Sequence, residues 1–261
     1  MNKRVSEKNI QARHDLRRKK RIREQKIRRY TFFAVLGIIA ILIVMFLTPL
    51  FHIKTVNIEG NSRVTVEEIN GKLGDLTGKN LFSTRKYSIK KKLADFAYVE
   101  NVAVKKKPFP PTLTVEIIEK QPAVQISYGE SFVVIDSEGI VLEKTVEKLE
   151  QIPICNGLKV STANEGEFIS LKSKETQEIV IECIGNMEKA DIIKDITQMS
   201  FEDMTNITFN YQSRLDVICG THIDFARKLE LFKQAVNSNK LTQNSRGTIN
   251  LATTGKAIYT P

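Results

Sequence analysis

The sequence predicts an α+β protein that a single N-terminal transmembrane helix anchors in a membrane. Three observations predict this architecture: an uncharged run at 30–51, a segment at 52–121 in which strand-like and helix-like spacing of apolar residues follow one another, and strand-like alternation through much of 122–251. Because 41% of the 261 residues are hydrophobic, the chain can bury a sizeable core, which excludes wholesale disorder.

The net charge of +10 is confined to the segment 1–29. It contains 13 Lys or Arg and 3 Asp or Glu, whereas the rest of the chain contains 27 of each sign. The body of the protein has no basic excess, which removes the main support for a nucleic-acid-binding function. We interpret 1–29 as a basic cytoplasmic tail that sets the topology and adheres to anionic headgroups. A nucleic-acid arm is less favoured, because no aromatic residue precedes Tyr30 to stack on bases, and a short docking helix is a third possibility.

Residues 30–51 are predicted to be the spanning helix. At ~1.5 Å per residue they reach roughly 33 Å, slightly more than the ~30 Å hydrocarbon core, so a modest tilt accommodates them. The run has no polar stripe, which a helix of a soluble protein with one face in water would show. It also ends in Thr48-Pro49-Leu50-Phe51 instead of the small-x-small site of a cleavable signal peptide, so we expect a retained anchor.

The orientation of this anchor follows from the Lys and Arg residues beside it. Thirteen precede the helix, and only Lys54 and Arg63 lie in the segment 52–71 that follows it. By the positive-inside rule, the N-terminus is expected in the cytoplasm. The domains from His52 onward are then expected outside the cytoplasm.

The segment 52–121 is predicted to fold as a small α/β sandwich with the element order β-α-α-β-β. Thr65 and Glu68 have the spacing of a capping box at the start of its first helix. Two helices can cover one face of a three-stranded sheet. The expected elements are strands at 53–58, 99–104 and 113–117 and helices at 66–73 and 89–97, with a proline-rich break at 108–111.

A second domain, 122–251, is expected to begin at Pro122, which cannot donate a hydrogen bond to a strand ladder. Residues 132–135 and 140–142 flank Gly139 and predict a hairpin. Apolar spacing predicts a helix over 225–236 and favours one over 179–187, although 178–184 could also alternate as a strand. Further strands are expected near 195–201, 206–211, 214–219 and 246–251, before a C-terminal tail at 252–261.

Three groups of residues resemble the DivIB/FtsQ family of cell-division proteins. The first resembles the opening of an FtsQ-type POTRA domain, the second its closing strands, and the third the start of the family's β domain. In order, they are Ile53, Val56, Ile58, Gly60 and Asn61; Val102, Val104, Pro111, Thr112, Leu113, Val115, Ile117, Glu119 and Pro122; and Phe132, Ile135, Asp136 and Gly139. With the anchor and the tail, the order of these features extends the resemblance to essentially the whole chain, although residues 150–245 hold few matching positions. The long basic arm and the lack of Trp are more similar to the Gram-positive DivIB branch.

The resemblance implies a non-enzymatic divisome scaffold at the division septum. Its POTRA domain would support recruitment, and its β domain would bind partners of the DivIC/FtsB and FtsL types, with septal peptidoglycan synthases as further partners. In the family, a partner strand extends a C-terminal β strand: an open edge supplies backbone hydrogen bonds, and alternate side chains select the partner. A strand at 248–251 inside the sheet, without a free edge, is the alternative. The matching positions are Arg246, Gly247, Thr248, Ile249, Asn250 and Leu251, with Ile258 and Tyr259.

The sequence lacks the motifs of an enzymatic outer domain. Gly-x-Ser-x-Gly, His-Glu-x-x-His and a glycine-rich phosphate loop are missing, and the only histidines outside the tail are His52 and His222. No cofactor or metal is expected. Cys155, Cys183 and Cys219 are interpreted as buried, reduced thiols, with one disulfide plus a free thiol as the alternative. A membrane-anchored cell-wall enzyme or another POTRA-bearing envelope assembly factor is the alternative function.

Overall fold

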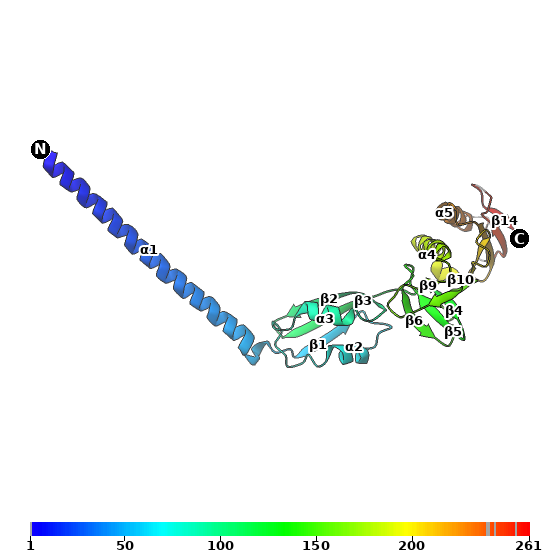
Figure 1. Cartoon of the computed structure of the whole chain (residues 1–261), viewed down its shortest axis with the longest axis horizontal. Coiled ribbons are helices and arrows are strands. Elements are labelled where there is room, and N and C mark those ends of the chain that lie inside the picture. Colours follow the sequence, from blue (N-terminus) through cyan, green and yellow to red (C-terminus); the bar gives the residue numbers. More distant parts are fainter. Residues whose placement is uncertain (1, 239–240, 243, 254) are drawn as a thin grey trace. The chain divides into compact units, whose positions relative to one another are not determined.

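The structure is a computed structural model that describes residues 2–238, 241–242, 244–253 and 255–261, with side chains from Arg23 onward. The packing of the chain separates two compact units. The first comprises Met1–Asn57, Asp75–Ser88 and Val104–Thr114, and the second comprises Ile58–Gly74, Ile89–Ala103 and Val115–Pro261. Along the chain, a long helix is followed by a small sheet with two helices and then by a large sheet with two helices (Figure 1).

Helix α1, Asn2–Leu47, runs from the basic stretch into the apolar run without a break. Its part Arg23–Leu47 is long and apolar enough to cross a membrane, and an 18-residue window within it has a mean hydropathy of 2.7. Helix α1 ends four residues before the end of the predicted span 30–51. Thr48 is extended, with φ −83° and ψ 144°, because the ring of Pro49 disfavours helical geometry in the preceding residue. A 3-10 turn, Pro49–Phe51, follows and buries the ring of Phe51.

The small domain has the predicted order β-α-α-β-β. Its elements are β1 (Thr55–Glu59), α2 (Val66–Leu73), α3 (Lys86–Leu93), β2 (Val99–Lys107) and β3 (Thr112–Glu119). Strand β3 is central in the sheet order β1-β3-β2. The predicted capping box begins α2: the Glu68 N–H donates to Thr65 Oγ1 at 3.3 Å, and the Thr65 N–H donates to Glu68 Oε2 at 2.8 Å.

The turn between β1 and α2 depends on two of the residues that carry the family resemblance. Gly60 has φ +83°, and a Cβ at this position would lie 2.2 Å from the carbonyl oxygen of Ile117 on β3. Glu119, at the end of β3, accepts hydrogen bonds from the three successive N–H groups of 62–64 at 2.9–3.1 Å. A carboxylate can satisfy several backbone donors at once, so Glu119 fixes the turn to the sheet.

The large sheet has nine strands in the order β14-β13-β12-β11-β10-β7-β4-β5-β6. Strand β7 runs parallel to β4 and β10, and β12 runs parallel to β13. The other neighbouring pairs are antiparallel, including the predicted hairpin β5-β6. The strands are β4 (Val124–Tyr128), β5 (Ser131–Ile135), β6 (Val141–Thr145), β7 (Ile154–Asn156), β10 (Ile196–Ser200), β11 (Ile207–Tyr211), β12 (Leu215–Gly220), β13 (Gly247–Asn250) and β14 (Ile258–Thr260).

The remaining elements pack against or beside this sheet. They are the two-stranded ribbon β8 (Val160–Thr162) and β9 (Ser170–Leu171), the helices α4 (Lys174–Lys189) and α5 (Phe225–Val236), and the 3-10 turn η2 (Ile193–Asp195). The ambiguous segment 178–184 is helical, within α4. Ser173 begins this helix by accepting the N–H of Thr176 at 3.2 Å.

One apolar core joins α4 and α5 to the large sheet. Helix α4 contributes Val180, Cys183, Ile184 and Met187, and α5 contributes Phe225, Leu229 and Phe232. The ring of Phe232 makes edge-to-face contacts with Phe209 and Tyr211 on β11, at centroid distances of 5.3 and 5.0 Å. Aromatic pairs favour this arrangement over a face-to-face stack. The Tyr211 hydroxyl donates to Asp195 Oδ2 at 3.1 Å, which satisfies its polar end.

Candidate functional site: the free edge of the large sheet

The two outer strands of the large sheet, β6 and β14, differ in how their edges are covered. The N-terminal part of β6 is paired with the loop at 166–168. The Val141 N–H donates to Glu167 O at 2.9 Å, the Gly166 N–H donates to Val141 O at 2.8 Å, and Ile140 forms a bridge with Phe168. The backbone groups of Val141, at the start of β6, are therefore already bonded within the chain.

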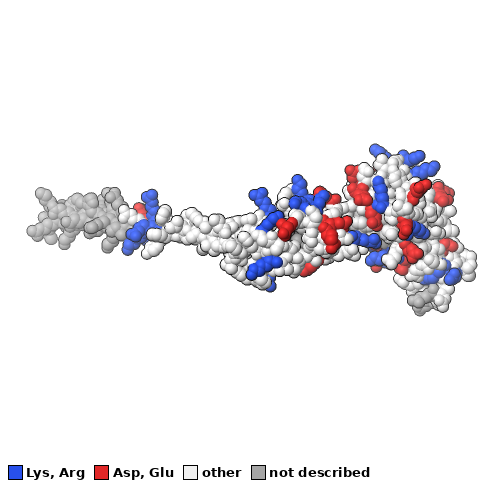
Figure 2. Space-filling model, turned by 90° about the horizontal axis from the view of Figure 1, so that it is seen from below, with Lys and Arg blue, Asp and Glu red and all other residues white. Residues whose placement is uncertain are grey.

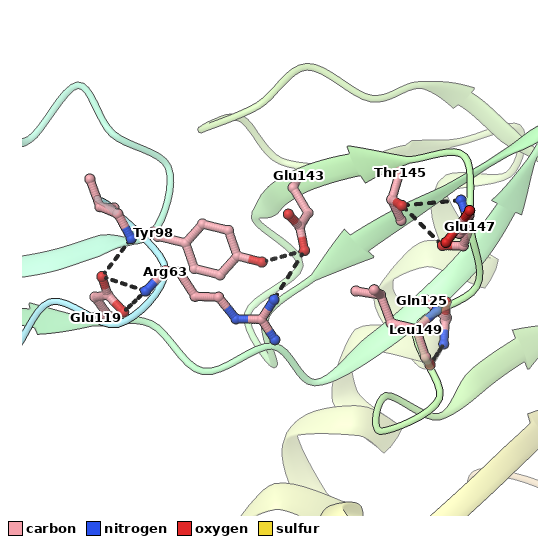
Figure 3. A network of polar contacts seen from close by, with 9 residues as sticks. Arg63, Tyr98, Glu119, Gln125, Glu143, Thr145, Glu147 and Leu149 are labelled. Carbon is pink, nitrogen blue, oxygen red and sulfur yellow. Dashed lines mark hydrogen bonds and ion pairs between the residues drawn. The ribbon is translucent and has the colours of Figure 1, made fainter. Parts of the chain in front are cut away.

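Side chains of the small domain also converge on β6. The Tyr98 hydroxyl donates to Glu143 Oε1 at 2.7 Å, and the Arg63 guanidinium lies 3.8 Å from the same oxygen and 5.9 Å from the centre of the Tyr98 ring. Figure 3 shows both groups directed at the Glu143 carboxylate. Burial, and then the hydrogen bond to Glu143, raise the pKa of Tyr98. Tyr98 therefore stays a neutral donor at physiological pH.

Buried polar contacts also hold the loop that follows β6. The Gln125 side chain on β4 is fully buried, and its Oε1 accepts the Leu149 N–H at 3.0 Å while its Nε2 donates to the carbonyl oxygens of Leu149 and Ile152 (Figure 3). A buried amide is tolerated only when its donors and acceptors are paired. The loop at 149–152 is thus fixed to β4.

The predicted strand at 246–251 lies inside the sheet and not at its edge. Strand β13 pairs with β12 on one side and with β14 on the other. Ile249 and Leu251 are core residues with 0% and 1% exposure. The hypothesis that 246–251 offers an open edge is therefore wrong, and the alternative of an interior strand describes β13. Segment 252–261, expected to be a tail, supplies the outer strand instead.

Strand β14 is the outer strand at the other end of the sheet. Tyr259 lies opposite the buried Ile249, and its hydroxyl donates to Arg246 O at 2.6 Å. Ile258 is 47% exposed and Thr260 is also exposed. Among the described strands, none pairs with the outer side of β14. Its backbone is the free edge of the sheet.

Gly247 allows β14 to lie in this position. Its φ of +142° suits glycine, and a Cβ there would lie 2.2 Å from the carbonyl oxygen of Thr260. Of the eight predicted site residues, Ile258 and Tyr259 lie on the edge strand, Thr248, Ile249 and Asn250 pair with it, and Gly247 makes room for it. Arg246 and Leu251 flank β13, and Arg246 contributes only a backbone acceptor to the described contacts of Tyr259.

The face of the sheet turned away from the helices carries a shallow polar groove of about 170 Å³. Its amide and hydroxyl groups are partly bonded to one another. Asn210 Nδ2 donates to Asp216 Oδ1 at 2.8 Å, and Asn210 Oδ1 accepts from Thr197 Oγ1, beside the groove, at 2.9 Å. The groove is lined by one carboxylate, Asp216, which accepts the Asn210 amide, and its lining includes no His, Cys, Lys or Arg.

All three cysteines are buried in the large domain and form no disulfide, as expected. Burial raises the pKa of the Cys183 and Cys219 thiols to about 12 and that of Cys155 further. Thiols that stay protonated in a core are poor nucleophiles and poor metal ligands. Within the described residues, no group of three or more His, Cys, Asp or Glu side chains could hold a metal ion.

The comparisons with known proteins agree with this architecture. A model of the FtsQ-type POTRA domain matches residues 51–120. The chain is 27% identical over 217 residues to the cell division protein DivIB of Clostridium acetobutylicum, which covers 81% of this chain and 83% of that protein. It is 26% identical over 248 residues to DivIB of Clostridium botulinum, with 93% of each chain covered.

These findings define a POTRA-bearing protein with one N-terminal apolar helix of the kind found in single-pass membrane proteins. The chain thus carries an FtsQ-type POTRA domain and is similar along most of its length to DivIB cell-division proteins, which supports a role in the divisome. Among solved structures, the chain matches the major extracytoplasmic domain of the trans isomer of DivIB from Geobacillus stearothermophilus, with a TM-score of 0.32 and 12% identity over 47% of this chain and 95% of that one.

Proposed function

We propose that the chain is a non-enzymatic scaffold at the division septum that binds DivIC/FtsB-type and FtsL-type partners by adding a partner strand to β14. The observation that carries the proposal is the free edge of β14, at the opposite end of the sheet from the covered strand β6. An exposed edge presents a row of unpaired N–H and C=O groups, which another chain can satisfy. β-Augmentation uses these groups for affinity.

Side chains around β14 would select the partner strand. Successive residues of a strand point to opposite faces, so Tyr259 shares the face of the buried Ile249, while Ile258 and Thr260 project from the other face. Ile258 is exposed and apolar, and an apolar side chain of the added strand would bury against it. The partner is therefore expected to carry an alternating apolar strand next to its coiled coil.

The membrane topology belongs to the same proposal. We place the basic N-terminal stretch in the cytoplasm, α1 across the membrane, and the two domains outside, where the division partners and the septal peptidoglycan synthases would meet them. The thirteen Lys and Arg before the span, against two in the segment 52–71 after it, support this orientation. We propose the boundaries 1–29, 30–51, 52–121, 122–251 and 252–261 for the five regions of the chain, with β14 inside the last of them.

The strand-addition proposal is tested by Ile258→Lys in the full chain, purified in nanodiscs and titrated with a DivIC-type coiled-coil protein. Natural edge strands use lysine to block pairing, so we expect at least about tenfold weaker binding. The substitution is preferable to deletion of 246–261, which would remove Ile249 and Leu251 from the core. Lysine at a side chain that is already 47% exposed leaves the core intact.

Ile223→Lys is the matched control. Ile223 is 63% exposed in the same domain, precedes α5 and lies outside the edge strand, so the same change of charge should leave the affinity unaltered. Equal affinities for the wild type, Ile258→Lys and Ile223→Lys would rule out β14 as the binding edge.

A further inference from the structure

The part of the first compact unit that lies beyond α1 is strongly cationic. Its segments 52–57, 75–88 and 104–114 hold seven basic side chains and one acidic side chain, Asp75, a net charge of +6. The chain from residue 30 onward is neutral, so this concentration of charge is local. We name these residues the juxtamembrane cationic surface: Lys54, Lys79, Arg85, Lys86, Lys105, Lys106 and Lys107.

Hydrogen bonds attach these segments to the end of the apolar helix. Asn80 Nδ2 donates to the carbonyl oxygens of Met45 and Phe46, in the last turn of α1, at 2.8 and 3.3 Å. The Leu81 N–H donates to Phe51 O at 2.9 Å. The loop at 78–85 is therefore held beside the end of α1, at the depth where the hydrocarbon core gives way to lipid headgroups.

Aromatic contacts reinforce the attachment. The Phe82 ring meets Phe46 of α1 at 6.5 Å and Phe51 at 5.2 Å, and Phe51 meets Phe109, from the turn between β2 and β3, at 5.5 Å. These rings join both cationic segments to the membrane helix within one compact unit. In the view of Figure 2, the first charged side chains beyond the bare apolar stretch of α1 are Lys and Arg.

Two of these cations, Lys86 and Lys106, lie close enough to influence each other. Lys106 Nζ donates to the Thr84 carbonyl oxygen, and burial and the nearby charge of Lys86 lower the pKa of Lys106. In the described part of the chain, no carboxylate forms an ion pair with Arg85, Lys86 or Lys107. Like charges that are gathered in this way are stabilised by an external anion.

Exposed apolar side chains accompany the charges. Leu50, Tyr87 and Phe109 are 58%, 75% and 62% exposed, and all three lie in the same compact unit. Aromatic rings with neighbouring Lys and Arg are typical of protein surfaces at the level of lipid headgroups. A soluble anion would not explain these exposed apolar groups, whereas a bilayer surface accommodates both kinds of side chain.

We propose that the juxtamembrane cationic surface docks the small domain on the anionic lipid headgroups of the bilayer that α1 crosses. The occupant is the bilayer because α1 brings this surface to it in the same chain. The proposal is independent of strand addition at β14. It also holds for whichever side of the membrane carries the domains.

The test uses the absence of Trp from the chain. Phe109→Trp places one fluorophore on the surface, in the full chain reconstituted in nanodiscs of phosphatidylcholine or of phosphatidylcholine with about one third phosphatidylglycerol. Both contain a lipid spin-labelled near its headgroup. We expect at least about twofold stronger quenching in the anionic bilayer, and loss of the difference on raising the ionic strength to about 1 M.

Adding the triple substitution Arg85→Glu, Lys86→Glu and Lys107→Glu should lower the quenching of Phe109→Trp in the anionic bilayer to the level found in phosphatidylcholine alone. A matched triple, Lys159→Glu, Lys172→Glu and Lys174→Glu, makes the same change of charge on exposed residues of the large domain and should leave the quenching unchanged. Phe168→Trp, at a side chain 65% exposed in the large domain, should stay unquenched in both bilayers.

Three results would overturn the proposal. One is equal quenching of Phe109→Trp in both bilayers, and another is an undiminished signal in the Arg85/Lys86/Lys107 triple. The third is a change in the Phe109→Trp fluorescence when soluble poly(glycerol phosphate) is added to phosphatidylcholine nanodiscs, together with no change when the nanodiscs contain anionic lipid. That result would assign the surface to a soluble polyanion.

Discussion

Tyr211 couples the ionisation of a phenol to the folding of the large sheet. Burial, and then its hydrogen bond to Asp195, raise the pKa of Tyr211 to about 12 from an ordinary value of 10.0. The folded domain therefore holds this proton more tightly than the unfolded chain does. The resulting stabilisation is complete below about pH 10 and is lost as the pH rises from there through the folded-state pKa near 12.

We accordingly expect the urea midpoint of the large domain to fall between about pH 10 and pH 11.5, and to fall less steeply in Tyr211→Phe. Pulse labelling of the buried thiols Cys183 and Cys219 reports the unfolding of this domain. Tyr87→Phe, at a ring 75% exposed, should keep the wild-type slope. A wild-type slope in Tyr211→Phe would show that the phenol is not coupled to folding.

Contacts between residues that are close in the sequence could be predicted, and contacts between residues that are distant in the sequence could not. Thr65 and Glu68 are close neighbours in the chain, so their capping box could be predicted from spacing alone. Tyr98 and Glu143 meet across 45 positions and carry no periodic signal. Glu119 was noticed only through the family resemblance, because its partners at 62–64 lie far from it in the sequence.

At the scale of elements, the position of β14 depends on the small size of residue 247. We expect Gly247→Ala to displace β14, because the added Cβ would lie 2.2 Å from the Thr260 carbonyl oxygen. Hydrogen exchange in 258–260 should become at least about tenfold faster, while α4 and β4 remain protected. Partner binding should weaken together with this loss of protection.

Gly166→Ala is the control for backbone strain. Gly166 also has positive φ, +79°, but an added Cβ there would meet nothing within 4 Å. This substitution should leave both partner binding and hydrogen exchange in 258–260 unchanged. Unchanged exchange in Gly247→Ala as well would mean that β14 accommodates the methyl group without moving.

Helices and hairpins were predicted better than strand order. The apolar spacing of 225–236 indicated α5 correctly, and Gly139 indicated the hairpin β5-β6. Strand β4 was missed because the buried Gln125 interrupts its apolar alternation, and β7 was missed because it is very short. The free edge of the large sheet was predicted at 246–251, but β13 has a second neighbouring strand formed by residues 258–260. A single sequence does not show which strands pair.

At the scale of the whole molecule, the proposed topology can be tested with introduced cysteines. The three native thiols are buried, so an exposed cysteine is the main site for a membrane-impermeant maleimide. We expect Phe168→Cys to be labelled on intact cells whose wall has been removed, and Lys26→Cys to be labelled only after lysis. Labelling of Lys26→Cys on intact cells, with Phe168→Cys protected, would invert the orientation.

The charge count of the sequence and the charge distribution of the fold lead to different expectations near the membrane. Only Lys54 and Arg63 follow the predicted span closely in the sequence, and this scarcity supports the proposed cytoplasmic position of the N-terminus. Folding then brings Arg85, Lys86 and 105–107 into the unit attached to α1. Counting along the chain therefore could not reveal the cationic surface, because its members are brought together only by the tertiary structure.

The attachment of Asn80 to the last turn of α1 makes the helix and the adjoining loop rotate as one body. Each residue of an α-helix adds about 100° of rotation and ~1.5 Å of length. One residue more or fewer in the apolar run would therefore rotate the loop at 78–85 by roughly a quarter turn about the helix axis, relative to the N-terminal part of α1. The length of the apolar run therefore determines the direction in which the loop at 78–85 faces as well as the distance that the helix covers. Only insertions or deletions close to a full helical turn would preserve that direction.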